Sequence, residues 1–135
     1  MNAEEVRALA RATLDGSMPF PAIVGNLIAC GVEYYHVDFA DGRFTFYSAA
    51  GAAISAPLQV DGLPPVAEDF DVAALKAAIL DSQQHGQRFT VFCQRAKQAG
   101  VQGYFAFLRG QRVTYLGRQG DQHVEWFPGT QPTDA

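Results

Sequence analysis

Two histidine-carboxylate pairs are the residues of this 135-residue chain whose types and spacing could do chemistry. His36 and Asp38 stand two apart in GVEYYHVDF, and His123 and Glu125 stand two apart in QHVEW. Both stretches alternate in the manner of β-strands, so each pair shares one strand face. If the two pairs converge, they could hold zinc or another divalent ion with positions left open for water. The alternative is a hydrogen-bonded or salt-linked pair on the surface of a sheet.

The composition indicates one globular domain over residues 1–135, because 48% of the residues are hydrophobic. A formal net charge of −4, with Lys and Arg scattered singly, gives no basic stripe and argues against a nucleic-acid partner. The chain shows neither a signal-peptide pattern nor an apolar run of about 18 residues that could span a membrane. We therefore expect a cytoplasmic protein with no membrane partner.

The two cysteines, Cys30 and Cys93, show no CxxC spacing, and both lie in helix-like apolar surroundings. This pattern predicts buried free thiols. The alternative for Cys93 is a nucleophile, but no histidine stands at helical spacing from it. No cofactor motif is present, and no cofactor is predicted.

The chain contains an internal duplication. Shifting the sequence by 69 residues lays 31–51 on 100–120 without a gap. The identical pairs are Gly31 and Gly100, Val32 and Val101, Tyr35 and Tyr104, Arg43 and Arg112, Thr45 and Thr114, and Gly51 and Gly120. One constant offset through several elements predicts pseudo-repeats over 1–56 and 70–128, a proline-rich connector over 57–69 and a frayed tail over 129–135.

Each repeat is predicted to run helix, helix and three strands. The helices are expected from Asn2 to Gly16, 21–30, Asp71 to Gly86 and 90–99, and the strands over 33–40, 43–49, 53–58, 103–109, 112–117 and 122–127. The fold class is α+β: internally duplicated helix-helix-β-β-β halves form an antiparallel sheet with the helices packed on one face.

Asp41-Gly42 predicts a two-residue hairpin turn, which places Phe39 opposite Phe44 and His36 opposite Tyr47. Alternation then divides the side chains between a core face and an outer face. The predicted outer face holds Tyr34, His36, Asp38, Arg43, Thr45, Tyr47, Ile54, Phe105, Phe107, Arg112, Thr114, Leu116, His123 and Glu125, with Val124 and Trp126 on the core face.

The predicted outer face is too apolar for a fully solvated sheet surface, so something should cover it. The candidates are the connector, a second copy of the chain and a small ligand. The duplicated arginines Arg43 and Arg112 are expected to pair with Asp38 or Glu125 across the hairpins, with an anion-binding role as the alternative.

A group of short motifs carries a family resemblance. They are Phe20-Pro21, Gly31-Val32, Tyr35-His36-Val37-Asp38, Ala99-Gly100-Val101, Tyr104, Val113-Thr114-Tyr115 and His123-Val124-Glu125. The chain resembles the YbcV-like family of small bacterial and prophage proteins of unknown function, often labelled "phage envelope protein". The resemblance implies a fold and a bacterial cytoplasmic setting but no reaction, and nothing in the sequence supports an envelope location.

Because no complete catalytic motif is present, we expect a non-catalytic module that binds a ligand or a protein through the outer face. The partners considered are a second copy, giving a homodimer, and a small molecule. The candidate binding residues are Tyr34, His36, Asp38, Arg43, Tyr47, Phe105, Phe107, Arg112, His123 and Glu125. The alternative is a small metal-dependent hydrolase or another enzyme that uses His36, Asp38, His123 and Glu125.

Overall fold

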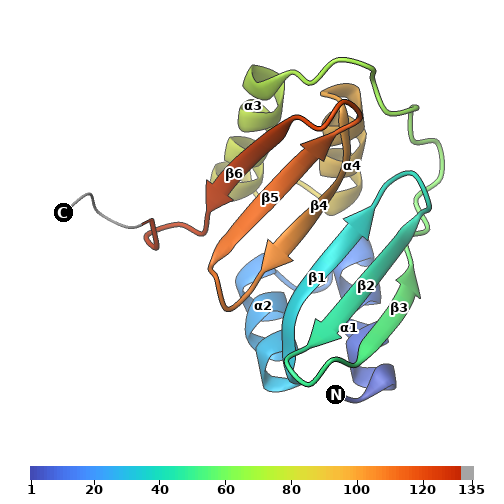
Figure 1. Cartoon of the computed structure of the whole chain (residues 1–135), viewed down its shortest axis with the longest axis vertical. Coiled ribbons are helices and arrows are strands. Elements are labelled where there is room, and N and C mark those ends of the chain that lie inside the picture. Colours follow the sequence, from blue (N-terminus) through green and yellow to red (C-terminus); the bar gives the residue numbers. More distant parts are fainter. Residues whose placement is uncertain (132–135) are drawn as a thin grey trace.

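The structure, a computed structural model, describes residues 1–131 and is a single sheet backed by helices. The elements are α1 (Ala3–Asp15), α2 (Phe20–Ala29), β1 (Val32–Asp38), β2 (Arg43–Ser48), β3 (Ala53–Pro57), α3 (Val72–His85), α4 (Phe89–Gln98), β4 (Val101–Phe107), β5 (Arg112–Gly117) and β6 (Gln122–Trp126). The strands pair antiparallel in the order β3-β2-β1-β4-β5-β6, and the helices all lie on one side of the sheet (Figure 1). The predicted α+β fold is confirmed.

The longer helix of each half begins and ends at the residues that the sequence predicts. The Asn2 side chain accepts a hydrogen bond from the Glu5 amide, and the Asp71 side chain accepts one from the Ala74 amide. Each satisfies an amide that has no partner within the first helical turn. Gly16 and Gly86 end these helices with φ of 71° and 62°, a conformation that glycine adopts without strain.

The duplication extends to the arrangement of the strands. β1 spans Val32–Asp38 and β4 spans Val101–Phe107, which is the same segment displaced by 69 residues. These two strands pair at the centre of the sheet, and His36 lies opposite Phe105, its own counterpart in the second half. An internal pseudo-two-fold axis therefore passes through the sheet between His36 and Phe105.

The core lies between the sheet and the helices. Val37 and Phe44 of the sheet are 0% and 1% exposed, and Leu27 and Leu75 of the helices are 1% and 0% exposed. Complete burial of such a side chain stabilises the fold by about 1.5 to 3 kcal/mol. The counterparts Tyr35 and Tyr104 are also buried in this layer, and burial raises the pKa of both phenols.

The predicted two-residue turn at Asp41-Gly42 is wrong. Asp38 pairs with Arg43, so the loop holds residues 39–42, and His36 lies opposite Thr45. The Asp38 carboxylate causes the difference, because it accepts hydrogen bonds from the amides of Ala40 and Asp41 at 2.9 Å each and so caps a wider turn. The register moves by two residues, which leaves the faces of β1 and β2 as predicted.

The faces predicted for β3 and β6 are reversed. Ile54 pairs with Phe46, and His123 pairs with the buried Tyr115, so both lie on the core face. The hairpins before these strands have three-residue turns, 49–51 and 118–120, the first closed by a 3.0 Å hydrogen bond from the Ser48 amide to the Ala52 carbonyl. An odd number of turn residues reverses the alternation. Glu125 therefore also lies on the core face, while Val124 and Trp126 lie on the outer face.

The connector 57–69 follows the edge of the sheet and does not cross its outer face (Figure 1). The Leu58 amide donates to the Gly42 carbonyl, and the Ala67 amide donates to the Lys97 carbonyl at the end of α4. The first of the three candidate covers for the outer face is therefore removed.

The tail begins with an ordered turn. The Thr130 hydroxyl donates to the carbonyl oxygens of Phe127 and Gln111 at 2.7 and 3.1 Å. Residues 132–135 of the predicted frayed tail lie outside the described residues. Over residues 1–131, no helix has the length and apolar character needed to cross a membrane.

Candidate functional site on the outer sheet face

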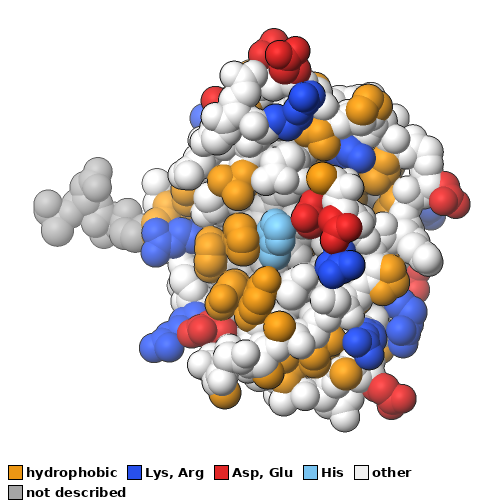
Figure 2. Space-filling model, turned by 45° about the vertical axis from the view of Figure 1, so that its right-hand side comes forward, with side chains coloured by type: hydrophobic (Ala, Val, Ile, Leu, Met, Phe, Trp, Pro, Cys, Tyr) orange, Lys and Arg blue, Asp and Glu red, His pale blue; other side chains and the backbone are white. Residues whose placement is uncertain are grey.

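The outer face of the sheet is the surface on which most of the predicted site residues meet. Its members are Tyr34, His36, Asp38, Arg43, Thr45, Tyr47, Ala53, Ser55, Pro57, Gly103, Phe105, Phe107, Arg112, Thr114, Leu116, Gln122, Val124 and Trp126. Hydrophobic side chains gather on this side of the molecule, with acidic and basic side chains next to them (Figure 2). No described segment lies over this face.

Five rings form a continuous row along β2, β1 and β4, which we call the aromatic row. Tyr47 stacks on Tyr34 with ring centroids 4.7 Å apart, and Tyr34 lies 5.8 Å from Phe107. Phe107 stacks on Phe105 at 5.8 Å, and Phe105 stacks on His36 at 4.3 Å. Each such pair contributes about 0.5 to 1.5 kcal/mol beyond the area it buries, so the row is a fixed platform that crosses the join between the halves.

His36 acts in this row as an aromatic ring. It lies beside Gly103, where a Cβ atom would stand 3.4 Å from His36 Nε2 and 2.5 Å from the Val37 carbonyl oxygen. Burial lowers the pKa of His36, and the nearby Asp38 carboxylate raises it by less, so the ring is neutral at pH 7. Because the Asp38 carboxylate bonds to the loop amides, it does not orient the imidazole as a catalytic partner would.

His123 and Glu125 form the hydrogen-bonded pair that the sequence allowed, but on the other side of the sheet. His123 Nε2 lies 2.9 Å from Glu125 Oε2, and the His123 side chain is only 14% exposed. Its ring lies 6.3 Å from that of the buried Tyr115, and both members of the pair line a hollow to which Lys76 of α3 also contributes. The convergence of the two histidine-carboxylate pairs is therefore contradicted, and residues 1–131 contain no group of three or more His, Cys, Asp or Glu residues that could hold a metal ion.

The two duplicated arginines make contacts that differ from the predicted ones. Arg43 Nε lies 3.1 Å from Asp41 Oδ2 in the loop. The Arg112 guanidinium lies 4.3 Å from the centroid of the Trp126 ring, a cation-π contact. Arg112 cannot pair with Glu125 because the two side chains leave opposite faces of the sheet. The sequence analysis does not predict this contact, because it places Trp126 on the core face.

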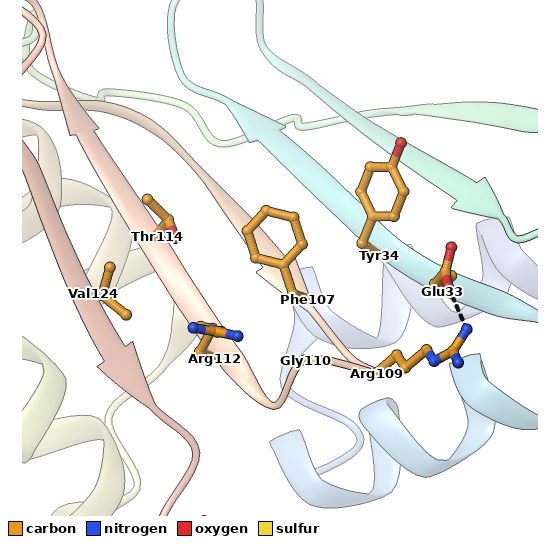
Figure 3. Close-up of a pocket in the computed structure, with 8 residues that line it drawn as sticks. All are labelled: Glu33, Tyr34, Phe107, Arg109, Gly110, Arg112, Thr114 and Val124. Atoms are coloured by element: carbon orange, nitrogen blue, oxygen red, sulfur yellow. Dashed lines mark hydrogen bonds and ion pairs between the residues drawn. The ribbon is translucent and has the colours of Figure 1, made fainter. Parts of the chain in front are cut away.

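A shallow hollow lies at the Arg112 end of the outer face (Figure 3). Its lining residues are Glu33, Tyr34, Phe107, Arg109, Gly110, Arg112, Thr114 and Val124. Arg109 Nη1 lies 3.3 Å from Glu33 Oε1, and the Arg109 side chain is 85% exposed. The sequence did not identify Glu33, Arg109, Gly110 or Val124 as site residues. A position-by-position comparison of the two repeats would have drawn attention to Arg109 and Gly110, because they stand where the first repeat has Ala40 and Asp41.

The cysteines lie away from the outer face. Cys93 is buried as predicted, and burial raises its pKa to about 12. Cys30 is only partly buried, with its Sγ 3.7 Å from Glu5 Oε2, and its pKa is also raised. A raised pKa disfavours the thiolate, so neither thiol is an activated nucleophile.

These features define a two-layer α+β protein with helices on one side of its sheet and an open aromatic surface on the other. The chain belongs to the DUF1398 family of proteins of unknown function, whose model matches residues 12–125 and so spans both halves. The narrower resemblance to the YbcV-like proteins stays a prediction. No curated protein matches the chain.

Proposed function

We propose that this protein is a non-catalytic binding module that holds the planar ring of a small molecule on its outer sheet face. The observation that carries this proposal is the aromatic row, whose members are stacked on one another, partly exposed and fixed on paired strands. Stacking of a planar ring on such a side chain is worth about 1 to 3 kcal/mol in proteins that bind bases in this way. The helices supply the core, so the outer face is free for recognition.

The chemistry of the same residues supports binding over catalysis. The neutral His36 ring is stacked on Phe105, and the Asp38 carboxylate is used by the loop. The second pair, His123 and Glu125, is on the core face. A hydrolase would need a nucleophile or a metal-bound water beside a general base, and the outer face does not assemble that set.

The shape of the outer face favours a ring over a second copy of the chain. Thr114 and Val124 are short, and they lie between the tall Phe107 ring and the edge of the sheet. Two sheets packed face to face lie about 10 Å apart, which would leave this low area without contacts. A planar ring is thin enough to lie on it.

We further propose a cytoplasmic setting in a bacterial cell, as the family resemblance implies. Two free cysteines are usual in a reducing compartment. Fractionation of the native host followed by immunoblotting would test the location.

The direct test is ligand-observed NMR with 2-naphthamide, a neutral planar probe, and cyclohexanecarboxamide as the non-planar control. We expect saturation transfer to the naphthyl protons only, and its loss in Phe107→Ala. Val91→Ala is the matched control, because Val91 is 43% exposed on α4, away from the outer face. Equal transfer to both probes, or none to either, contradicts the proposal.

Light scattering separates the second candidate, a homodimer. We expect a monomer. If the protein is instead a dimer, and if Tyr47→Lys and Phe107→Lys each convert it to a monomer, then a second copy of the chain, and not a planar ring, occupies the outer face.

A further inference from the structure

The two ends of the outer face are related by the internal two-fold axis, yet they differ in charge. At one end lie Tyr34 and Phe107, with Arg109 in the following loop. Their counterparts at the other end, 69 residues away in sequence, are Gly103, Asp38 and Ala40. One end is thus aromatic and cationic, whereas the other is small and acidic.

Each end carries one of the two equivalent arginines, Arg43 or Arg112, and in the part of the chain that the structure describes only Arg43 is neutralised by a carboxylate. Arg43 is paired with Asp41, whose counterpart in the second half is Gly110. Among residues 1–131, no carboxylate lies within ion-pair distance of Arg112. The Arg112 guanidinium rests on Trp126, which restrains it while leaving the edge of the group free to donate hydrogen bonds.

The hollow beside Arg112 has a shape that can hold a planar ring. Figure 3 shows Phe107 and Tyr34 standing on one side and Thr114, Val124 and Arg112 on the other. Val124 is 42% exposed, and Thr114 is partly exposed, so both can contact a ligand. Arg109 lines the rim of the hollow with its guanidinium turned toward Glu33, and because this exposed ion pair is of the weak surface kind, Arg109 is available as a second cation once it releases Glu33.

We propose that this hollow binds a planar aromatic or heteroaromatic anion. The ring packs against Phe107 over Thr114 and Val124, and its carboxylate or phosphate accepts hydrogen bonds from Arg112, with Arg109 as the second cation. The inference rests on the proposed function and adds the charge of the ligand and its position. Aromatic carboxylic acids and nucleoside monophosphates share this chemistry.

The test uses the indole N–H of Trp126, which gives a single NMR signal because the chain has one tryptophan. The wild-type protein is titrated with two matched pairs of probes, 2-naphthoate with 2-naphthamide and AMP with adenosine. We expect the charged member of at least one pair to bind about tenfold more tightly than the neutral one, since a charge-assisted hydrogen bond is about twice as strong as a neutral one. The pair that shows the larger ratio identifies the source, an aromatic acid or a nucleotide.

The duplication supplies the control variant. Arg112→Gln should abolish the preference for the charged probe, whereas Arg43→Gln, its counterpart at the other end, should leave it unchanged. Equal affinity for the charged and neutral members of both pairs in the wild-type protein overturns the inference and leaves the proposed function standing. If no probe of either pair shifts any outer-face signal, both fail. The wild-type comparison decides the matter even if Arg112→Gln does not fold.

Discussion

The two halves of this protein keep the same backbone, and the contrast between their side chains is clearest in the central strands, β1 and β4. On the core face, Val32 and Tyr35 of β1 have the identical counterparts Val101 and Tyr104 in β4. On the outer face, none of the three side chains of β1 is repeated in β4, where Gly103, Phe105 and Phe107 stand in place of Tyr34, His36 and Asp38. Packing against the helices constrains the first set, whereas on the outer face close backbone contact fixes Gly103 and leaves the other two pairs of positions free to vary. A difference of this kind between copies indicates where function has been placed.

The largest expected effect comes from Gly103, the smallest residue on the outer face. Gly103→Ala places a Cβ atom 2.5 Å from the backbone oxygen of Val37, so the central strands must separate. We expect a loss of roughly 2 to 4 kcal/mol of unfolding free energy, at the upper end of overpacking effects. Urea denaturation measures it.

Gly25→Ala is the control for Gly103→Ala. A Cβ atom at Gly25, in α2, meets nothing within 4 Å, so this change should stabilise the protein by about 0.5 to 1 kcal/mol. If Gly103→Ala has the same urea midpoint as the wild-type protein, the close pairing of β1 with β4 is wrong.

An effect of intermediate size on stability should distinguish the β1–β2 hairpin from its counterpart, the β4–β5 hairpin. Gly42 has φ of 68°, and its counterpart Gln111 has φ of 58°, so only the first half has the residue that suits this conformation. We expect Gly42→Gln to destabilise by about 1 kcal/mol and Gln111→Gly to stabilise by a few tenths of a kcal/mol or more. The melting temperatures of both variants test whether the two turn positions are equivalent. If both changes shift the melting temperature in the same direction, the positions are not equivalent.

A smaller, pH-dependent effect should follow from His36. Its pKa in the folded protein is lowered by burial below the ordinary value of 6.5, so the unfolded chain takes up the proton first as the pH falls. The contribution of His36 to stability is therefore lost as the pH falls below 6.5 towards the folded pKa. His36→Phe, which copies Phe105, should fold and should show a smaller loss of melting temperature between pH 7.5 and 5.5.

The His36→Phe result also bears on the role of the imidazole. If the variant unfolds at pH 7.5, the imidazole is needed for structure and the interpretation of His36 as one ring of the aromatic row is wrong. An unchanged pH dependence would instead mean that His36 is not desolvated in the folded protein.

The fold was predictable because the signals for it are local and occur twice. Caps such as Asn2 and Asp71 and the constant offset between repeats required no knowledge of long-range contacts. The register of β1 with β2 was not predicted, because Asp38 caps its own loop. The Asp41-Gly42 dipeptide indicated a two-residue turn and gave no sign of this role of Asp38. The face of β6 was missed because one residue in a turn reverses every side chain after it.

The candidate site was only partly predictable for the same reason. Tyr34, His36, Phe105 and Phe107 follow from alternation within their own strands. The Glu33 and Arg109 contact joins residues 76 positions apart and depends on the pairing of β1 with β4, which the sequence did not specify. Trp126, placed under Arg112 by the turn at 118–120, could be assigned to the outer face only once that turn was known.

An exchange between the two ends of the outer face tests the central claim most directly. Phe107→Asp copies Asp38 into the aromatic end, and Asp38→Phe copies Phe107 into the acidic end, with binding of 2-naphthoate followed through the Trp126 indole N–H signal. We predict that Phe107→Asp remains folded and loses at least about tenfold in affinity, since it removes a stacking ring and adds a like charge, while Asp38→Phe binds as the wild type does. Wild-type affinity in a folded Phe107→Asp variant would contradict the account.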